Sequence, residues 1–177
     1  ATYDSLFARA MLQADRVRAA AAQSPQLTLI TSQSELSQLL ARRGRGEAVV
    51  GALLGTEGSH ALDGQLDNIG QLYDAGVRMT GLHHFFDNRL GGSRRGEEQT
   101  GLTPFGELAV RNMQKKGIMI DVAHSSEATV RDTLRVTEGD ALIVSHTGFD
   151  GHCPSPRNIS DETMALITEA GGLIGVG

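Results

Sequence analysis

MIDVAHSS, at residues 119–126, begins as an apolar run and ends in a histidine followed by two serines. An apolar run that is buried on both faces is typical of a strand in a parallel sheet. The chain repeats this arrangement, because residues 50–58 lead to Glu57 and residues 142–147 lead to His146. In a β/α barrel, the groups that carry out chemistry lie at the carboxyl ends of such strands. One glutamate and two histidines at the same end of one sheet therefore predict a metal site.

The rest of the chain alternates between apolar strands and amphipathic helices. The expected strands are 27–30, 48–54, 77–82, 118–122, 141–144 and 173–176. The expected helices are 3–22, 33–43, 62–74, 104–116, 127–136 and one that begins near residue 161. Such units form a parallel sheet, either as a closed barrel or as an open doubly wound sheet. No G-x-G-x-x-G motif follows a strand, so the open nucleotide-binding alternative loses support.

The number of strand–helix units bears on how much of a barrel this chain contains. A closed barrel needs eight units, whereas the sequence holds only about five or six. We therefore expect an α/β fold of the (β/α)8 TIM-barrel type, with residues 1–177 forming a single domain that is an incomplete barrel. Further N-terminal and C-terminal parts of the barrel are expected to lie outside this sequence.

The overall composition favours a packed core and excludes some partners. Hydrophobic residues make up 40% of the chain and charged residues 21%, which argues against disorder. The net charge is −5, and the small arginine clusters at 42–45 and 94–95 are typical of solvated loops, so no nucleic-acid partner is expected. Cys153 is the only cysteine, which rules out an internal disulfide. No stretch is long and apolar enough to span a membrane, and the choice between cytoplasm and periplasm stays open, as does self-association.

The candidate metal ligands also have a purely structural interpretation. Glu57 could be an ordinary loop carboxylate, and a single histidine at a strand end is commonly a hydrogen-bonded core residue. The combination of Glu57, His124 and His146 nevertheless favours a metal site. Neutral imidazole is the commonest metal ligand, and a carboxylate can bridge two ions that activate a water molecule.

Two further groups are candidates for substrate contact. His83 and His84 end another strand, and only one of them can point toward the metal site because side chains alternate along a strand. The apolar pattern that precedes them does not choose between the two. Arg157 lies in the turn PSPRN, where it is either a surface charge or a fork for a substrate carboxylate.

Several of these stretches together resemble the membrane (renal) dipeptidase family of metallo-barrels. They occur in the family's order, with similar gaps, and cover nearly the whole chain. The matching stretches are GTEGSH at 55–60, GVRMTGLHH at 76–84, GLTPFG at 101–106, IDVAHSS at 120–126, SHT at 145–147 and SPRNI at 155–159.

The resemblance implies a zinc-dependent hydrolase that cleaves dipeptides by attack of a bridging hydroxide, with two zinc ions in each complete site. It implies that Glu57 bridges both ions and that His124 and His146 bind the second ion. His84 matches the histidine that contacts the substrate near the scissile carbonyl, so Glu57 and His84 are the expected catalytic residues. Arg157 matches the arginine that holds the terminal carboxylate of the substrate.

The chain also departs from the family pattern. The family places a His-x-Asp pair on its first strand, and no histidine precedes His60 here. The family's aspartate near the last barrel strands falls beyond Gly177. Two alternatives therefore stay open. One is a related amidohydrolase that acts on lactams or acylated amino acids, and the other is a non-catalytic remnant that folds only with a partner chain and binds at most one ion.

Overall fold

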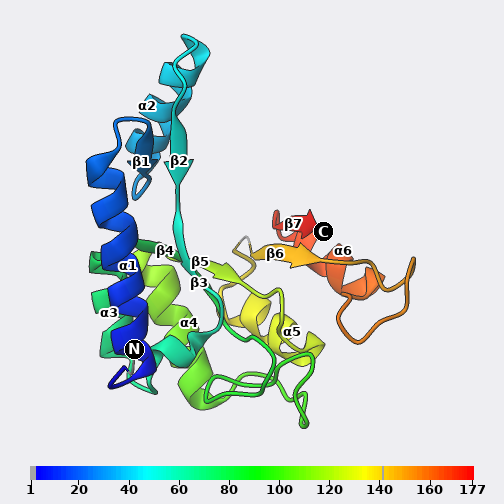
Figure 1. The fold of residues 1–177 in the computed structure, drawn as a ribbon. Helices are drawn as coiled ribbons and strands as arrows, with labels where there is room; N and C mark the ends of the chain where they lie inside the picture. The colour runs from blue at the N-terminus through cyan, green and yellow to red at the C-terminus, as the bar shows by residue number, and fades with distance from the viewer. Residues whose placement is uncertain (1–2, 141) are drawn as a thin grey trace.

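The computed structural model describes residues 3–140 and 142–177, and strands alternate with helices along them (Figure 1). The strands are β1 (Leu27–Leu29), β2 (Val50–Ala52), β3 (Leu54–Thr56), β4 (Val77–Gly81), β5 (Met119–Asp121), β6 (Ile143–Thr147) and β7 (Leu173–Val176). The helices are α1 (Leu6–Gln23), α2 (Gln33–Gly44), α3 (Asp67–Asp74), α4 (Pro104–Lys116), α5 (Glu127–Val136) and α6 (Asp161–Glu169), with a short 3-10 helix, η1 (Ser59–Leu62). None of the described helices is long and apolar enough to cross a membrane.

The main sheet has five parallel strands in the order β3-β4-β5-β6-β7. The spatial order follows the chain order, and helices α4, α5 and α6 connect the last four strands. This is the arrangement of successive β/α units, so the expectation of a parallel α/β sheet is confirmed. Because every strand runs the same way, all five carboxyl ends lie at one edge of the sheet.

The expectation of one strand at 48–54 is wrong. The structure divides this segment into β2, which pairs with β1 in a separate two-stranded sheet, and β3, which pairs with β4. Figure 1 shows β2 and β3 along one extended segment, with β1 and α2 at its far end. An apolar run reports that the backbone is extended, but it does not report which neighbour each half pairs with. Since β3 extends to Thr56, Glu57 follows it directly.

Helix boundaries follow local capping signals. The Thr103 hydroxyl accepts a hydrogen bond from the Gly106 amide and Pro104 is the first residue of α4, which ends at Gly117 with a φ of 76°. The expected helices 104–116 and 127–136 are confirmed. The expected helix 62–74 is wrong at its start, because Asp63 and Gly64 have φ angles of 47° and 68° and separate η1 from α3. Left-handed residues of this kind interrupt a helix.

The end of the expected strand 141–144 also needs correction. Residue 141 lies outside the described residues, and β6 extends to Thr147, so His146 belongs to the strand rather than to the loop after it.

The main core lies between the sheet and the helices that cover it. Many of its buried side chains come from β4, β5 and β6 on one side and from α3, α4, α5 and α6 on the other. They include Leu72, Val77, Val110, Met113, Ile120, Val130, Val144 and Ile167. A smaller cluster of Ile30, Leu39 and Val49 stabilises the β1–β2 unit. Burying one such side chain contributes about 1.5–3 kcal/mol, so this layer fixes the sheet edge that carries the site.

Candidate metal centre

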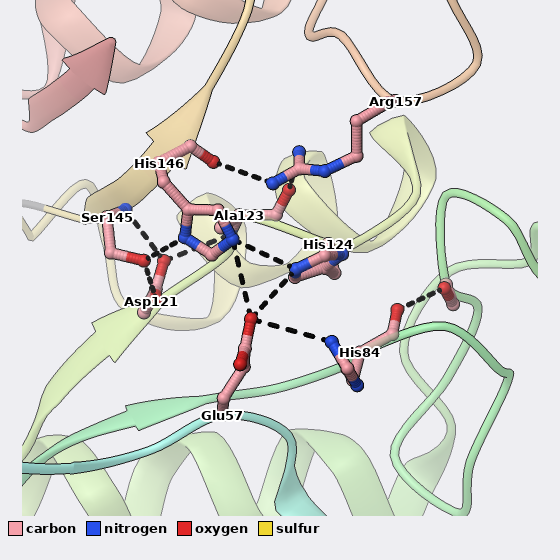
Figure 2. A network of polar contacts seen from close by, with 9 residues as sticks. Glu57, His84, Asp121, Ala123, His124, Ser145, His146 and Arg157 are labelled. Carbon is pink, nitrogen blue, oxygen red and sulfur yellow. Dashed lines mark hydrogen bonds and ion pairs between the residues drawn. The ribbon is translucent and has the colours of Figure 1, made fainter. Parts of the chain in front are cut away.

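Three strands of the main sheet, β3, β5 and β6, deliver the candidate metal ligands to one edge of the sheet. Glu57 directly follows β3, His124 lies in the turn after β5, and His146 is near the carboxyl end of β6. The structure brings these three sequence-predicted side chains together, as Figure 2 shows.

The donor atoms of the three side chains form a nearly equilateral triangle. Glu57 Oε1 is 3.1 Å from His124 Nε2 and 3.4 Å from His146 Nε2, and the two nitrogens are 3.2 Å apart. In a tetrahedral zinc site with bonds of about 2.0–2.1 Å, neighbouring donor atoms are about 3.3–3.4 Å apart. One carboxylate oxygen and two imidazole nitrogens are also donors that zinc binds. The residues present therefore fit an ion of this size.

The environment favours the metal-binding form of the more buried histidine. Only 6% of His124 is exposed, and this burial lowers its pKa; the nearby positive charge of Arg157 lowers it further. A lowered pKa keeps the imidazole neutral near pH 7, and the neutral ring is the form that binds metals. The side chain of Glu57 is half exposed, so the triangle can be reached from solvent.

The structure distinguishes between the two adjacent histidines after β4. His84 Nε2 is 3.6 Å from Glu57 Oε1, and its ring lies 4.8 Å from that of His124. His83 is 1% exposed and faces the interior, where Nδ1 lies 3.0 Å from Ser125 Oγ. His84 therefore lies beside the candidate metal ligands, whereas His83 is buried in the interior.

A folded loop after β4 holds His84 in place. The Ser93 hydroxyl donates a hydrogen bond to the His84 carbonyl oxygen at 2.9 Å. Asp87 folds the loop back on itself, since its carboxylate accepts hydrogen bonds from the backbone amides of Ser93 and Glu98. This loop is therefore ordered by its own side chains and presents His84 next to Glu57.

Arg157 lies across the ends of β5 and β6. Its guanidinium group donates hydrogen bonds to the carbonyl oxygens of His146, at 3.2 Å, and Ala123, at 3.5 Å. An arginine has five N–H donors, so about three remain after these two contacts. Burial lowers the pKa of Arg157, and the charge of Arg95 lowers it further, but an arginine stays protonated near neutral pH. The free donors make Arg157 able to bind an anionic group beside the histidines.

Two residues that the sequence analysis did not single out complete the site. Asp121 and Ser145 lie on neighbouring strands next to His146 and connect to it by hydrogen bonds (Figure 2). The only signal in the sequence was a charged residue, Asp121, inside the apolar run at 119–123. A buried carboxylate is costly without partners, so its presence in such a run indicates a hydrogen-bonding role.

Comparison with known proteins places this chain in a family. Residues 1–177 match the family model described as membrane dipeptidase, peptidase family M19. Dipeptidase 3 of Mus musculus is 31% identical and that of Rattus norvegicus 30% identical, each over 93% of this chain. The chain spans about a third of the length of these curated relatives, 33% in both cases.

Solved structures share the fold. The probable dipeptidase PvdM from Pseudomonas aeruginosa superposes with a TM-score of 0.84 at 22% identity, over 93% of this chain and 42% of that one. A metallopeptidase from Rhodobacter sphaeroides, solved with a phosphinate mimic of the dipeptide L-Ala-D-Ala, superposes with a TM-score of 0.79 at 22% identity, over 93% of this chain and 47% of that one. Together with the sequential parallel sheet, this likeness confirms the expected α/β fold of the TIM-barrel type. Because the family model matches residues 1–177, the chain belongs to the membrane dipeptidase family, peptidase family M19.

Proposed function

We propose that the protein is a metal-dependent hydrolase of dipeptides in which Glu57, His124 and His146 bind metal. The observation that carries this proposal is the triangle of donor atoms, with edges of 3.1, 3.2 and 3.4 Å, in a chain of the dipeptidase family. The relative from Rhodobacter sphaeroides binds a mimic of a dipeptide, which supports the same substrate class here. Two zinc ions bridged by Glu57 are the metal content that we propose for the complete site.

The remaining polar groups have separate tasks in this proposal. Bound ions would lower the pKa of a water molecule so that hydroxide is available near neutral pH. His84, which is beside Glu57, donates a hydrogen bond to the amide oxygen as negative charge develops on it. Arg157 binds the C-terminal carboxylate of the substrate through its free N–H groups. A side chain that grips this carboxylate next to the metal site leaves room for only a short substrate.

The experiment is hydrolysis of dipeptides by the full-length protein, loaded with zinc or depleted by a chelator. We expect the activity to depend on zinc. Glu57→Gln should lower the activity to that of the zinc-depleted protein and should also lose bound zinc. The matched control is Glu162→Gln, since Glu162 pairs with Arg131 on the surface. We expect this variant to keep both activity and zinc.

Other substrates in the same assay test the two alternatives. Faster hydrolysis of lactams or N-acylated amino acids than of dipeptides would favour a related amidohydrolase. A full-length protein that binds at most one ion and cleaves none of these substrates would favour a non-catalytic remnant. Dipeptide hydrolysis that persists after chelation and in Glu57→Gln would contradict the proposal.

A further inference from the structure

Asp121, the last residue of β5, is a buried carboxylate that connects both candidate histidine ligands. It is 5% exposed. Its Oδ1 atom accepts hydrogen bonds from the backbone amides of Ala123 and Ser145, both at 3.0 Å. Its Oδ2 atom contacts the Ser145 hydroxyl, and that hydroxyl lies 2.9 Å from His146 Nδ1 (Figure 2). Asp121 thus contacts its own turn and the neighbouring strand.

The hydrogen bonds of Ser145 determine where the His146 proton lies. A hydroxyl has a single hydrogen to donate, and an ionised carboxylate only accepts. Because Asp121 Oδ2 and Ser145 Oγ are both oxygens in contact, the serine hydrogen lies between them. Ser145 Oγ can therefore only accept from His146, which requires a hydrogen on Nδ1. In the neutral ring, Nε2 is then left with a free lone pair that faces Glu57 and His124.

Asp121 also stabilises the turn that carries His124. The Ala123 amide binds Asp121 Oδ1, and the Ser125 amide binds the Val122 carbonyl oxygen at 3.0 Å. These two bonds fold the chain back immediately after β5, which brings the His124 ring next to Glu57. A single buried carboxylate therefore orients one histidine through the backbone and the other through a serine.

We propose that Asp121 is a positioning residue that fixes the Nδ1–H tautomer of His146 through Ser145, so that Nε2 is free to bind metal. The proposal rests on the metal site described under Proposed function. Groups that hydrogen-bond to a ligating histidine fix its tautomer and ring orientation in other metal sites. Here the carboxylate acts through an intervening hydroxyl rather than directly.

Three substitutions separate this role from a merely structural one. Ser145→Ala removes the hydroxyl but keeps both backbone amides that bind Asp121. Ser145→Thr keeps the hydroxyl and serves as the conservative control. Asp121→Asn keeps an oxygen for the two amides but turns an NH₂ group toward Ser145 Oγ. Ser145 then donates its own hydrogen to His146 Nδ1, which moves the histidine proton to Nε2.

The test uses the full-length protein, labelled with ¹⁵N-histidine and free of metal at pH 8. Two-bond ¹H–¹⁵N correlations distinguish the tautomers, and His146→Gln identifies the signals. We expect Nδ1–H in the wild type and in Ser145→Thr, a mixture in Ser145→Ala, and Nε2–H in Asp121→Asn. Zn²⁺ affinity, measured by competition with a chromophoric chelator, should fall roughly 10- to 100-fold in Ser145→Ala and Asp121→Asn, as for other outer-shell partners, and stay unchanged in Ser145→Thr.

An Nε2–H tautomer in the wild type would overturn the proposal. A Ser145→Ala variant that keeps both the Nδ1–H tautomer and wild-type Zn²⁺ affinity would also overturn it. This variant decides the question even if Asp121→Asn does not fold. A wild type that binds no Zn²⁺ would instead refute the proposed function, while the tautomer measured without metal would still decide the role of Asp121.

Discussion

At the scale of single residues, Arg157 is held by backbone carbonyl groups rather than by an acidic side chain. Its charge is therefore not neutralised by these partners and is available to a substrate. If the full-length protein hydrolyses dipeptides as proposed, Arg157→Ala should lose about 2–4 kcal/mol of transition-state stabilisation, measured as a fall in kcat/KM, because a charge-assisted pair with the substrate carboxylate is lost. Zinc content should remain that of the wild type, since Arg157 is not one of the proposed ligands.

Two controls identify the group that Arg157 binds. Arg131→Ala removes a surface arginine that pairs with Glu162, and it should leave kcat/KM unchanged. Blocking the C-terminal carboxylate of the dipeptide as an amide should lower kcat/KM of the wild type about as much as the Arg157→Ala substitution does. The same blocked substrate should lower kcat/KM of Arg157→Ala only slightly. If the wild type cleaves the amide as well as the free acid, Arg157 does not bind this carboxylate and the dipeptidase proposal weakens.

His83 gives a second prediction, on stability rather than activity. Burial lowers its pKa in the folded protein to about 4, from an ordinary value of 6.5. As pH falls below 6.5, the unfolded chain takes up this proton first, so the free energy of unfolding decreases until the pH reaches about 4. Between pH 7.5 and pH 5, His83 should lower the free energy of unfolding by about 2 kcal/mol.

The measurement is urea unfolding of the metal-free, full-length protein at both pH values, with His83→Gln as the comparison. Glutamine does not ionise, so the variant should lose about 2 kcal/mol less than the wild type on going from pH 7.5 to pH 5. Equal pH dependence in the two proteins would show that His83 does not titrate in this way.

At the scale of secondary structure, sequence signals located elements well where the signal is local. Helix α4 has a capping threonine, a proline at its first position and a glycine after its end, and its predicted and observed bounds agree. The segment 48–54 lacked such a signal. Its apolar residues indicate an extended backbone, but the change of partner between β2 and β3 depends on contacts with Leu27 and Val77, which are distant in sequence.

The same distinction explains what could be predicted of the site. Glu57, His124 and His146 each follow or end an apolar strand, and parallel strands deliver their carboxyl ends to one edge. This placement is visible in the sequence. The contact between Asp121 and Ser145 is not, because it depends on the register in which β5 aligns with β6, where Asp121 lies opposite Ile143.

A glycine in β4 allows the Glu57 segment to approach closely. A Cβ atom at Gly81 would lie 3.0 Å from the Gly58 nitrogen and 3.3 Å from the Thr56 carbonyl oxygen, both backbone atoms. We predict that Gly81→Ala displaces Glu57 and weakens Zn²⁺ binding by at least about tenfold, the lower end of the effects seen for disturbed outer-shell contacts. The measurement is Zn²⁺ affinity by chelator competition.

Gly55→Ala in β3 is the matched control. A Cβ atom there would lie 3.0 Å from the Met79 methyl group, the flexible end of a side chain that can move aside. Unchanged affinity in this variant and a loss in Gly81→Ala would support the geometry, whereas equal affinities would mean that the Glu57 segment adapts without cost.

At the scale of the whole molecule, the sheet formed by residues 3–140 and 142–177 ends on both sides in a strand with one neighbour. β3 and β7 are the outer strands of the five, and Leu173 and Val176 of β7 are 68% and 61% exposed. Unpaired strand edges with exposed apolar side chains promote association with other chains. These exposed strand edges support the expectation that residues 1–177 are part of a larger barrel, which we propose here.

This proposal predicts that residues 1–177, expressed alone, associate into heterogeneous oligomers. Size-exclusion chromatography with light scattering measures the mass distribution, and the full-length protein is the control, for which we expect a single species. A monodisperse monomer of residues 1–177 that unfolds cooperatively in urea would contradict the incomplete barrel.

The central claim, that Glu57, His124 and His146 bind a metal ion together, is tested most directly by anomalous diffraction. Crystals of the full-length protein grown with Zn²⁺ would be measured on both sides of the zinc absorption edge. The account predicts an anomalous peak about 2.0–2.2 Å from a Glu57 carboxylate oxygen, His124 Nε2 and His146 Nε2. A zinc-loaded crystal with no peak at this position, or with the peak bound by other residues, would contradict it.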